Sequence, residues 1–170
     1  VIAGIAEMGW YLRTYLNLLD ASRESARYLA DLDPTIYDST LNGHSQYFTA
    51  NQLTEEFCNA TYDFYAVGAC YVMALVPNEL NRENEFDDIV ITAYTVQQGT
   101  VLYEFPPDGC GWSMTGNQCH KKTPQSINDQ FDDLSPRQGV VIVEVFYLHQ
   151  QALGFPLFTM FVPEGIGVFV

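Results

Sequence analysis

Hydrophobic and polar residues over positions 1–31 recur with the spacing of an α-helix. The polar positions follow one another at intervals of four and three residues, and they are Arg13, Asn17, Asp20, Glu24, Arg27 and Asp31. The opposite face carries apolar and small residues, which are Ile5, Gly9, Leu12, Leu16, Leu19, Ala26 and Ala30, interrupted by Arg23. Because proline disfavours helical backbone in the residue before it, the pair Asp33-Pro34 ends the predicted helix.

The length of this helix is its most informative property. At about 1.5 Å per residue, a helix over 1–31 is about 46 Å long, which exceeds the diameter of a domain of this size. We therefore expect part of it to project or to pack on another chain, rather than to lie on its own sheet throughout. The residues expected to form the packing surface are Ile2, Ile5, Gly9, Leu12, Leu16, Leu19 and Ala26.

Residues 32–170 show the patterns of short helices and β-strands, and we expect them to form a globular head. Short helices are predicted to start near Thr54, over 62–76, and at Thr123-Pro124, where threonine caps and proline opens a helix. Strands are predicted over 89–96, 100–105, 140–148 and 166–170, with a turn at 97–99. The stretch 140–148 is apolar on both faces apart from Glu144, which is typical of a central strand. The fold class expected is α+β, with a long N-terminal helix followed by an antiparallel sheet and short helices.

Composition narrows the class of protein further. The chain has 170 residues with 21 acidic and 7 basic side chains, which gives a formal net charge of −14. Such acidity argues against binding to nucleic acid or to anionic lipid, because both attract clusters of Lys and Arg. Hydrophobic residues make up 48% of the chain and charged residues 16%, so we expect it to fold rather than to remain disordered.

The four cysteines, Cys58, Cys70, Cys110 and Cys119, allow three disulfide pairings, and the sequence alone does not choose among them. The segment from Cys110 to Cys119 is rich in glycine, which favours its closure into a loop. On one unbroken helix Cys58 and Cys70 would lie about 18 Å apart, so they pair only if the helix breaks within residues 59–63. An exported protein with oxidised cysteines is favoured over a cytosolic protein with four reduced thiols.

Recognisable catalytic and cofactor-binding motifs are missing from the sequence, so we predict that the protein is not an enzyme and has no cofactor. His120 with Cys110 and Cys119 offers three zinc ligands but no fourth, and a disulfide loop is the better interpretation. The acidic run over 79–88 lacks the pattern of a calcium loop, so a solvated connector is favoured.

Two further polar residues are candidates for a role. Glu144 is expected to be a hydrogen-bonded structural carboxylate or to face a neighbouring subunit, because no second carboxylate is identifiable beside it. The triplet Asn59-Ala60-Thr61 fits the N-glycosylation pattern, which makes Asn59 a candidate modification site.

The first twelve residues are apolar apart from Glu7. A membrane span needs about 20 such residues, so this stretch alone does not cross a bilayer, but its pattern is typical of the end of a span. Trp10 and Tyr11 lie where aromatic residues gather at a membrane interface, and Arg13 follows them. The alternative is an ordinary core helix that begins near Val1.

Two consecutive stretches resemble the TadE-like proteins of tight-adherence (Flp-type) pilus systems. Residues 4–11, GIAEMGWY, and 21–28, ASRESARY, are similar to the GIxEFGR-like and AAREGARYA-like motifs that follow the hydrophobic N-terminal segment in that family. Residues 87–91, 111–113, 116–118 and 143–147 also look like a TadE-like domain. The family's processing site and the first part of its membrane segment have no counterpart in this sequence, and Cys110 and Cys119 are an addition to its common pattern.

The resemblance implies a pilin-like fold and a minor pilin or pseudopilin, a structural subunit of a filament without catalytic residues. Such a protein is exported, is held in the inner membrane by an upstream segment before assembly, and exposes its head outside the cell. Its expected partners are other pilin subunits, in a homopolymer or a heteropolymer. The alternative is a secreted surface adhesin whose aromatic residues, such as Trp112, stack on glycans.

Overall fold

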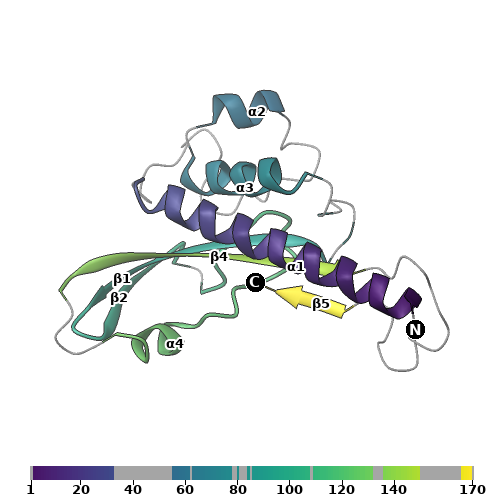
Figure 1. Ribbon diagram of the computed structural model, residues 1–170. Helices are drawn as coiled ribbons and strands as arrows, with labels where there is room; N and C mark the ends of the chain where they lie inside the picture. The colour runs from purple at the N-terminus through teal and green to yellow at the C-terminus, as the bar shows by residue number, and fades with distance from the viewer. Residues whose placement is uncertain are drawn as a thin grey trace.

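The computed structural model of the chain describes residues 2–32, 55–61, 63–77, 80, 84, 86–107, 109–131, 136–149 and 166–169. The elements in chain order are α1 (Ile2–Leu29), α2 (Glu55–Ala60), α3 (Phe64–Leu75), β1 (Asp88–Gln97), β2 (Thr100–Phe105), β3 (Trp112–Ser113), α4 (Pro124–Asn128), β4 (Gln138–His149) and β5 (Ile166–Phe169). A long N-terminal helix followed by an antiparallel sheet and short helices confirms the predicted α+β fold (Figure 1).

The two longest strands lie in the middle of the sheet. The strand order is β2-β1-β4-β5, and the short β3 also pairs with β1. β1 and β4 are antiparallel, from Asp88 opposite Phe146 to Val96 opposite Gln138. This pairing confirms the prediction that the apolar stretch 140–148 is a central strand. The predicted turn between the first two strands is also present, with Gly99 at a φ of 70°.

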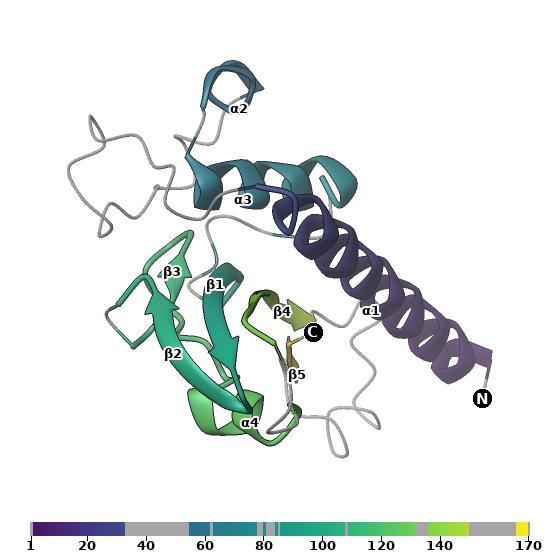
Figure 2. The same cartoon turned by 90° about the vertical axis from the view of Figure 1, so that its left-hand side faces the viewer.

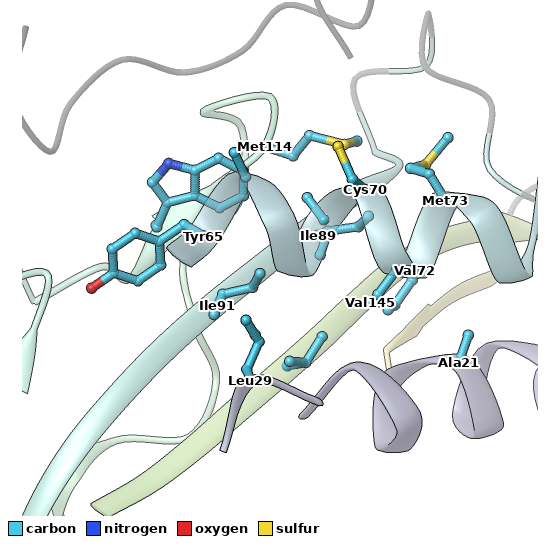
Figure 3. Close-up of a cluster of buried hydrophobic side chains, with 14 of the residues drawn as sticks. Ala21, Leu29, Tyr65, Cys70, Val72, Met73, Ile89, Ile91, Met114 and Val145 are labelled. Atoms are coloured by element: carbon cyan, nitrogen blue, oxygen red, sulfur yellow. The ribbon is translucent and has the colours of Figure 1, made fainter. Parts of the chain in front are cut away.

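Side chains alternate between the two faces of the sheet, and each face has its own cover. One face, which includes Ile89 and Ile91 of β1 and Val145 of β4, forms the main core with α1 and α3 (Figure 3). On the opposite face, Tyr94 packs with Ile127 of α4 in a smaller core. The sheet therefore lies between a helical layer and a layer that contains α4, as the two views of the fold show (Figures 1 and 2).

The second half of α1 packs closely on α3 because the residues between them are small. Ala21 and Ser25 of α1 are 2% and 0% exposed. The Ser25 hydroxyl donates a hydrogen bond to the backbone carbonyl of Gly68 in α3 at 3.0 Å. A Cβ on Gly68 would lie 2.6 Å from Leu29 Cδ1 and 2.8 Å from Ile91 Cδ1. The small residues in this half of α1 thus serve helix packing within the chain.

Candidate functional site: the outer stripe of the first helix

α1 carries two stripes of side chains with helical spacing, and only one of them is buried within the chain. The inner stripe is buried and consists of Thr14, Leu18, Ala21, Ser22, Ser25 and Leu29. The outer stripe consists of Ile5, Met8, Leu12 and Leu16, which are 69%, 62%, 49% and 52% exposed. Spacings of three and four residues place these four side chains on one face of the helix. α1 therefore presents a row of large apolar side chains to solvent.

The predicted packing residues of α1 do not all share this environment. Those up to residue 16 are exposed, and they are Ile5, Gly9, Leu12 and Leu16. Those further along the helix, Leu19 and Ala26, are half-buried. The side chain of Ile2 lies outside the described part of the chain. The N-terminal part of α1 extends past α3 (Figure 1).

The small residues of the first helix, among them Ala21, Ser22 and Ser25, indicated a close approach of helices in the sequence, but Thr14, Leu18 and Leu29 of the inner stripe and Met8 of the outer stripe were not identified. Thr14, Ser22 and Ser25 are 6%, 5% and 0% exposed, although threonine and serine are usually found at the surface. The available signal was their repeat, together with Leu18 and Leu29, at steps of three and four residues. Hydrophobicity alone conceals such a stripe, because three of its six members, Thr14, Ser22 and Ser25, are polar.

The first third of α1 makes a polar contact with the end of the sheet. Glu7 Oε1 lies 3.5 Å from Nε2 of His149, the last residue of β4. The Tyr11 ring meets the same imidazole edge-on, with 5.1 Å between ring centroids. Trp10 is 59% exposed on another side of the helix. The first third of α1 thus exposes apolar side chains on more than one side. A helix that is apolar on several sides is typically buried among other apolar groups.

Among the described residues, no helix has both the length and the hydropathy that a membrane span requires.

Both cysteine pairs that are neighbours in the sequence are bonded. The Cα atoms of Cys58 and Cys70 lie 5.7 Å apart, and those of Cys110 and Cys119 lie 4.6 Å apart. Two disulfides indicate an oxidising compartment outside the cytoplasm. Because Cys110 and Cys119 are bonded to each other, they are not available as zinc ligands beside His120.

The helix break that the first pair requires lies where it was predicted. α2 ends at Ala60 and α3 begins at Phe64. Asp63 between them caps α3, because its carboxylate accepts hydrogen bonds from the backbone N–H groups of Tyr65 at 3.0 Å and Ala66 at 2.9 Å. The cap fixes the start of α3, and the break turns α2 back so that Cys58 reaches Cys70.

Reduction of the purified protein is expected to raise its intact mass by about 4 Da, since four cysteines form two disulfides and each takes up two hydrogen atoms. Mass spectrometry of the unfolded protein with and without reductant measures this difference. Peptide mapping of the non-reduced protein should recover Cys58 linked to Cys70 and Cys110 linked to Cys119. An unchanged mass, or peptides with another pairing, would contradict the two disulfides.

Residues 109–123, here called the strap, contain β3, which pairs with β1, and continue to Tyr94 and Glu144 on the second face of the sheet. Asp88 at the start of β1 holds the first part of the strap, and it is 0% exposed. Its carboxylate accepts hydrogen bonds from the Ser113 hydroxyl at 2.6 Å and from the backbone N–H groups of Thr115 and Gln118 at 3.0 Å. It also accepts one from the backbone N–H of Ile89 at 2.8 Å. A single buried carboxylate thus satisfies donors from both β1 and the strap.

Three side chains of the sheet hold the second part of the strap. The backbone N–H of Lys121 donates to both carboxylate oxygens of Glu144 at 3.0 Å. The Tyr94 hydroxyl donates to the backbone carbonyl of Lys122 at 2.8 Å. His120 Nε2 lies 3.0 Å from Glu104 Oε1. Glu144 is thus a hydrogen-bonded structural carboxylate, which is one of the two roles that the sequence indicated.

Burial raises the pKa of Glu144 above its ordinary value, and the hydrogen bond from the Lys121 N–H opposes this shift. A carboxyl group with a raised pKa in the folded state binds more protons than the unfolded chain does. Its contribution to the free energy of unfolding therefore falls as the pH rises from about 4.5. Glu144→Gln is expected to remove this loss, so that the variant gains stability relative to wild type between pH 4 and pH 7.

Urea unfolding of both proteins at these two pH values measures the effect. Glu56→Gln, at an exposed position on α2, is the control and should leave the pH dependence unchanged. The quantity to compare is the difference in the free energy of unfolding between Glu144→Gln and wild type. If this difference is the same at pH 4 and at pH 7, the charge of Glu144 is not destabilising.

The remaining candidates from the sequence occupy different environments. Trp112 is 5% exposed, and its ring stacks on Tyr65 with 5.9 Å between centroids. Asn59 is exposed on α2. In the acidic run, Asp87 and Asp88 are buried, whereas Glu79, Glu83 and Glu85 lie outside the described residues. Where the chain is described, no three His, Cys, Asp or Glu side chains are grouped to hold a metal ion.

Comparisons with protein-family models, with curated proteins and with solved structures gave no match. The geometry of the chain itself is therefore the guide to its function. Its buried carboxylates at Asp88 and Glu144 accept hydrogen bonds from the strap, which is a structural use. The outer stripe of α1 is a contiguous row of exposed apolar side chains, which is typical of a surface that packs against a partner.

Proposed function

We propose that the protein is a structural subunit of an extracellular pilus or pilus-like filament and that it assembles through the outer stripe of α1. The observation that carries the proposal is that Ile5, Leu12 and Leu16 are exposed on a helix whose neighbouring stripe is buried in the core. The TadE-like resemblance of residues 4–11 and 21–28 supports the same function. The partners would be other pilin subunits, of this chain or of a related one.

Burial of the outer stripe would contribute favourable free energy to association. Burying a large apolar side chain fully is worth about 1.5–3 kcal/mol. The four side chains are half to two thirds exposed, so their burial offers roughly 1–2 kcal/mol each. In a filament each subunit has more than one neighbour, and the contribution is repeated at every contact. The helix would thus supply the apolar axis, while the rest of the head faces solvent.

The location follows from the same proposal. The two disulfides support export from the cytoplasm. Before assembly, the apolar first third of α1 would lie at the inner membrane, with Trp10 at the interface and Arg13 beyond it. After assembly, the same side chains would be covered by neighbouring subunits at the cell surface.

Leu16→Asp is expected to abolish assembly and to leave the head folded. Leu16 is 52% exposed, so a carboxylate there is solvated in the free subunit but unpaired and buried at the proposed interface. Sedimentation velocity and negative-stain microscopy measure assembly, and circular dichroism with thermal unfolding measures the fold.

The matched control lies two positions along the same helix. Leu18 is 0% exposed in the main core, so Leu18→Asp is expected to unfold the head itself. Asp20→Asn changes an exposed polar position outside both stripes and should alter neither property. Wild-type protein that stays a compact monomer, or a Leu16→Asp variant that assembles as wild type does, would refute the proposal.

The alternative is a glycan-binding adhesin, for which Trp112 was the named example of a sugar-stacking ring. Because this ring is stacked on Tyr65 in the core, it has no open face to present to a sugar. Trp112 is therefore not a sugar-stacking ring in this fold, and the outer stripe of α1 favours the structural function.

A further inference from the structure

Lys121 and Lys122 are the only lysines of the chain, and both are exposed on the strap. They lie in a strongly acidic head: residues 32–170 hold 17 of the 21 acidic and 4 of the 7 basic residues, a balance of −13. Neither ammonium group forms an ion pair with a carboxylate of the described residues. The lysine pair is therefore an exposed positive feature on a negative surface.

The backbone beneath the lysine pair is held from three sides. Glu144 binds the N–H of Lys121, and Tyr94 binds the carbonyl of Lys122. His120 lies against Glu104, its backbone N–H donates to the Cys110 carbonyl at 2.8 Å, and its Nδ1 lies 2.9 Å from the Lys122 carbonyl. The disulfide at Cys119 closes the strap immediately before these residues.

This arrangement uses buried groups to fix the backbone and leaves the ammonium groups outside. The carboxylate of Glu144 accepts hydrogen bonds from the backbone N–H of Lys121, and the charge of Lys122 attracts it without forming an ion pair. Lys121 Nζ lies 5.8 Å from the centroid of the Phe146 ring, which steadies its side chain by a weak cation–π contact. A rigid backbone lowers the entropy that a surface loses when it binds a partner. The backbone that carries the lysine pair is thus preorganised for binding.

We propose that the lysine pair is the point at which the head binds the acidic head of a second copy of this chain. The inference rests on the proposed function, because it concerns the contact between heads of assembled subunits. Two heads that each carry a balance of −13 repel one another over about 8 Å at physiological ionic strength. If a neighbouring head places its carboxylates against Lys121 and Lys122, the attraction between these opposite charges offsets part of the repulsion between the heads.

The composition of the chain makes a direct test feasible. A carbodiimide joins an amine to a carboxylate only where the two are in contact, and the only side-chain amines here belong to Lys121 and Lys122. An assembled mixture of ¹⁴N- and ¹⁵N-labelled subunits is treated with the carbodiimide and digested. We expect peptides that contain the lysine pair of one copy joined to an Asp or Glu peptide of the other isotope.

Substitution gives the second measurement. Lys121→Gln and Lys122→Gln are each expected to weaken assembly by about 1.5- to 5-fold at low salt, with a smaller effect at high salt. Arg137→Gln is the matched control, because Arg137 is also an exposed cation of the head but lies outside the strap. An equal effect of Arg137→Gln would show that only overall charge matters, and it would overturn the proposal.

The outcomes also separate this inference from the proposed function. Subunits that assemble by sedimentation but give no joined peptides between copies refute the lysine contact and leave the outer stripe of α1 intact as the assembly surface. Joined peptides of one isotope only, formed within a single copy, refute it as well. A wild-type protein that neither assembles nor forms joined peptides refutes both proposals.

Discussion

Asp88→Ala is expected to lower the free energy of unfolding by about 3 kcal/mol or more, because each buried donor that loses its acceptor costs about 1–3 kcal/mol. The Asp88 carboxylate accepts hydrogen bonds from the Ser113 hydroxyl and from the backbone N–H groups of Ile89, Thr115 and Gln118. Alanine supplies no acceptor, and the site is 0% exposed, so water does not replace it without opening the strap. For a chain of this size, the melting temperature should fall by about 10 °C.

Thermal and urea unfolding measure this loss, and hydrogen exchange shows where it acts. Backbone N–H groups of Thr115 and Gln118 should exchange faster in the variant, whereas those of α3 should change only as global stability does. Asp88→Asn keeps the shape and one acceptor oxygen and should lose less. Asp20→Ala, at an exposed position on α1, should stay within about 0.5 kcal/mol of wild type. An Asp88→Ala variant as stable as wild type would show that the strap does not depend on this carboxylate.

Gly68→Leu is expected to separate α1 from α3 and to lower stability by about 3 kcal/mol. A Cβ at this position would already lie 2.6 Å from Leu29 Cδ1 and 2.8 Å from Ile91 Cδ1. The remaining atoms of a leucine have no space unless the helices move apart. That movement also breaks the hydrogen bond of 3.0 Å from the Ser25 hydroxyl to the Gly68 carbonyl.

Two variants isolate the cause of this loss. Gly68→Ala adds only the Cβ, which the ends of the Leu29 and Ile91 side chains can accommodate by rotation, and alanine favours helix by about 1 kcal/mol over glycine. Its net effect should therefore be small. Ala74→Leu places the same large side chain on the exposed side of α3 and should be tolerated. Urea unfolding of the three variants measures these differences, and a Gly68→Leu variant with wild-type stability would contradict the close packing.

Local features of the fold follow from local sequence. The hairpin of β1 and β2 was predicted from two apolar runs around Gln97-Gln98-Gly99, and the turn has the positive φ that glycine adopts easily. Thr123 caps α4, and Pro124 is its first residue, as their order indicates. In each case the interactions that decide the structure join residues only a few positions apart, so the pattern in the sequence contains them.

The disulfides depend on both local sequence and the arrangement of neighbouring elements. Spacing and glycine content favoured the closure of Cys110 with Cys119, and the pairing of Cys58 with Cys70 was conditional on a helix break. The break between α2 and α3 satisfied the condition. The partners of Asp88 were different: Thr115 and Gln118 lie 27 and 30 residues away. No spacing rule connects a carboxylate at a strand start with a loop at that distance.

Periodicity and caps are local properties, and they were enough to specify the long N-terminal helix, its outer row of Ile5, Leu12 and Leu16, the strands and the short helices. Packing between distant elements selected the side of α1 that is buried. Ser22 and Ser25 lie in the inner stripe because Gly68 allows α3 to approach α1 closely. Close packing of two helices selects small side chains, whether or not they are hydrophobic. The outward position of Lys121 and Lys122 also required the folded sheet, since their backbone is held by Tyr94 of β1 and Glu144 of β4.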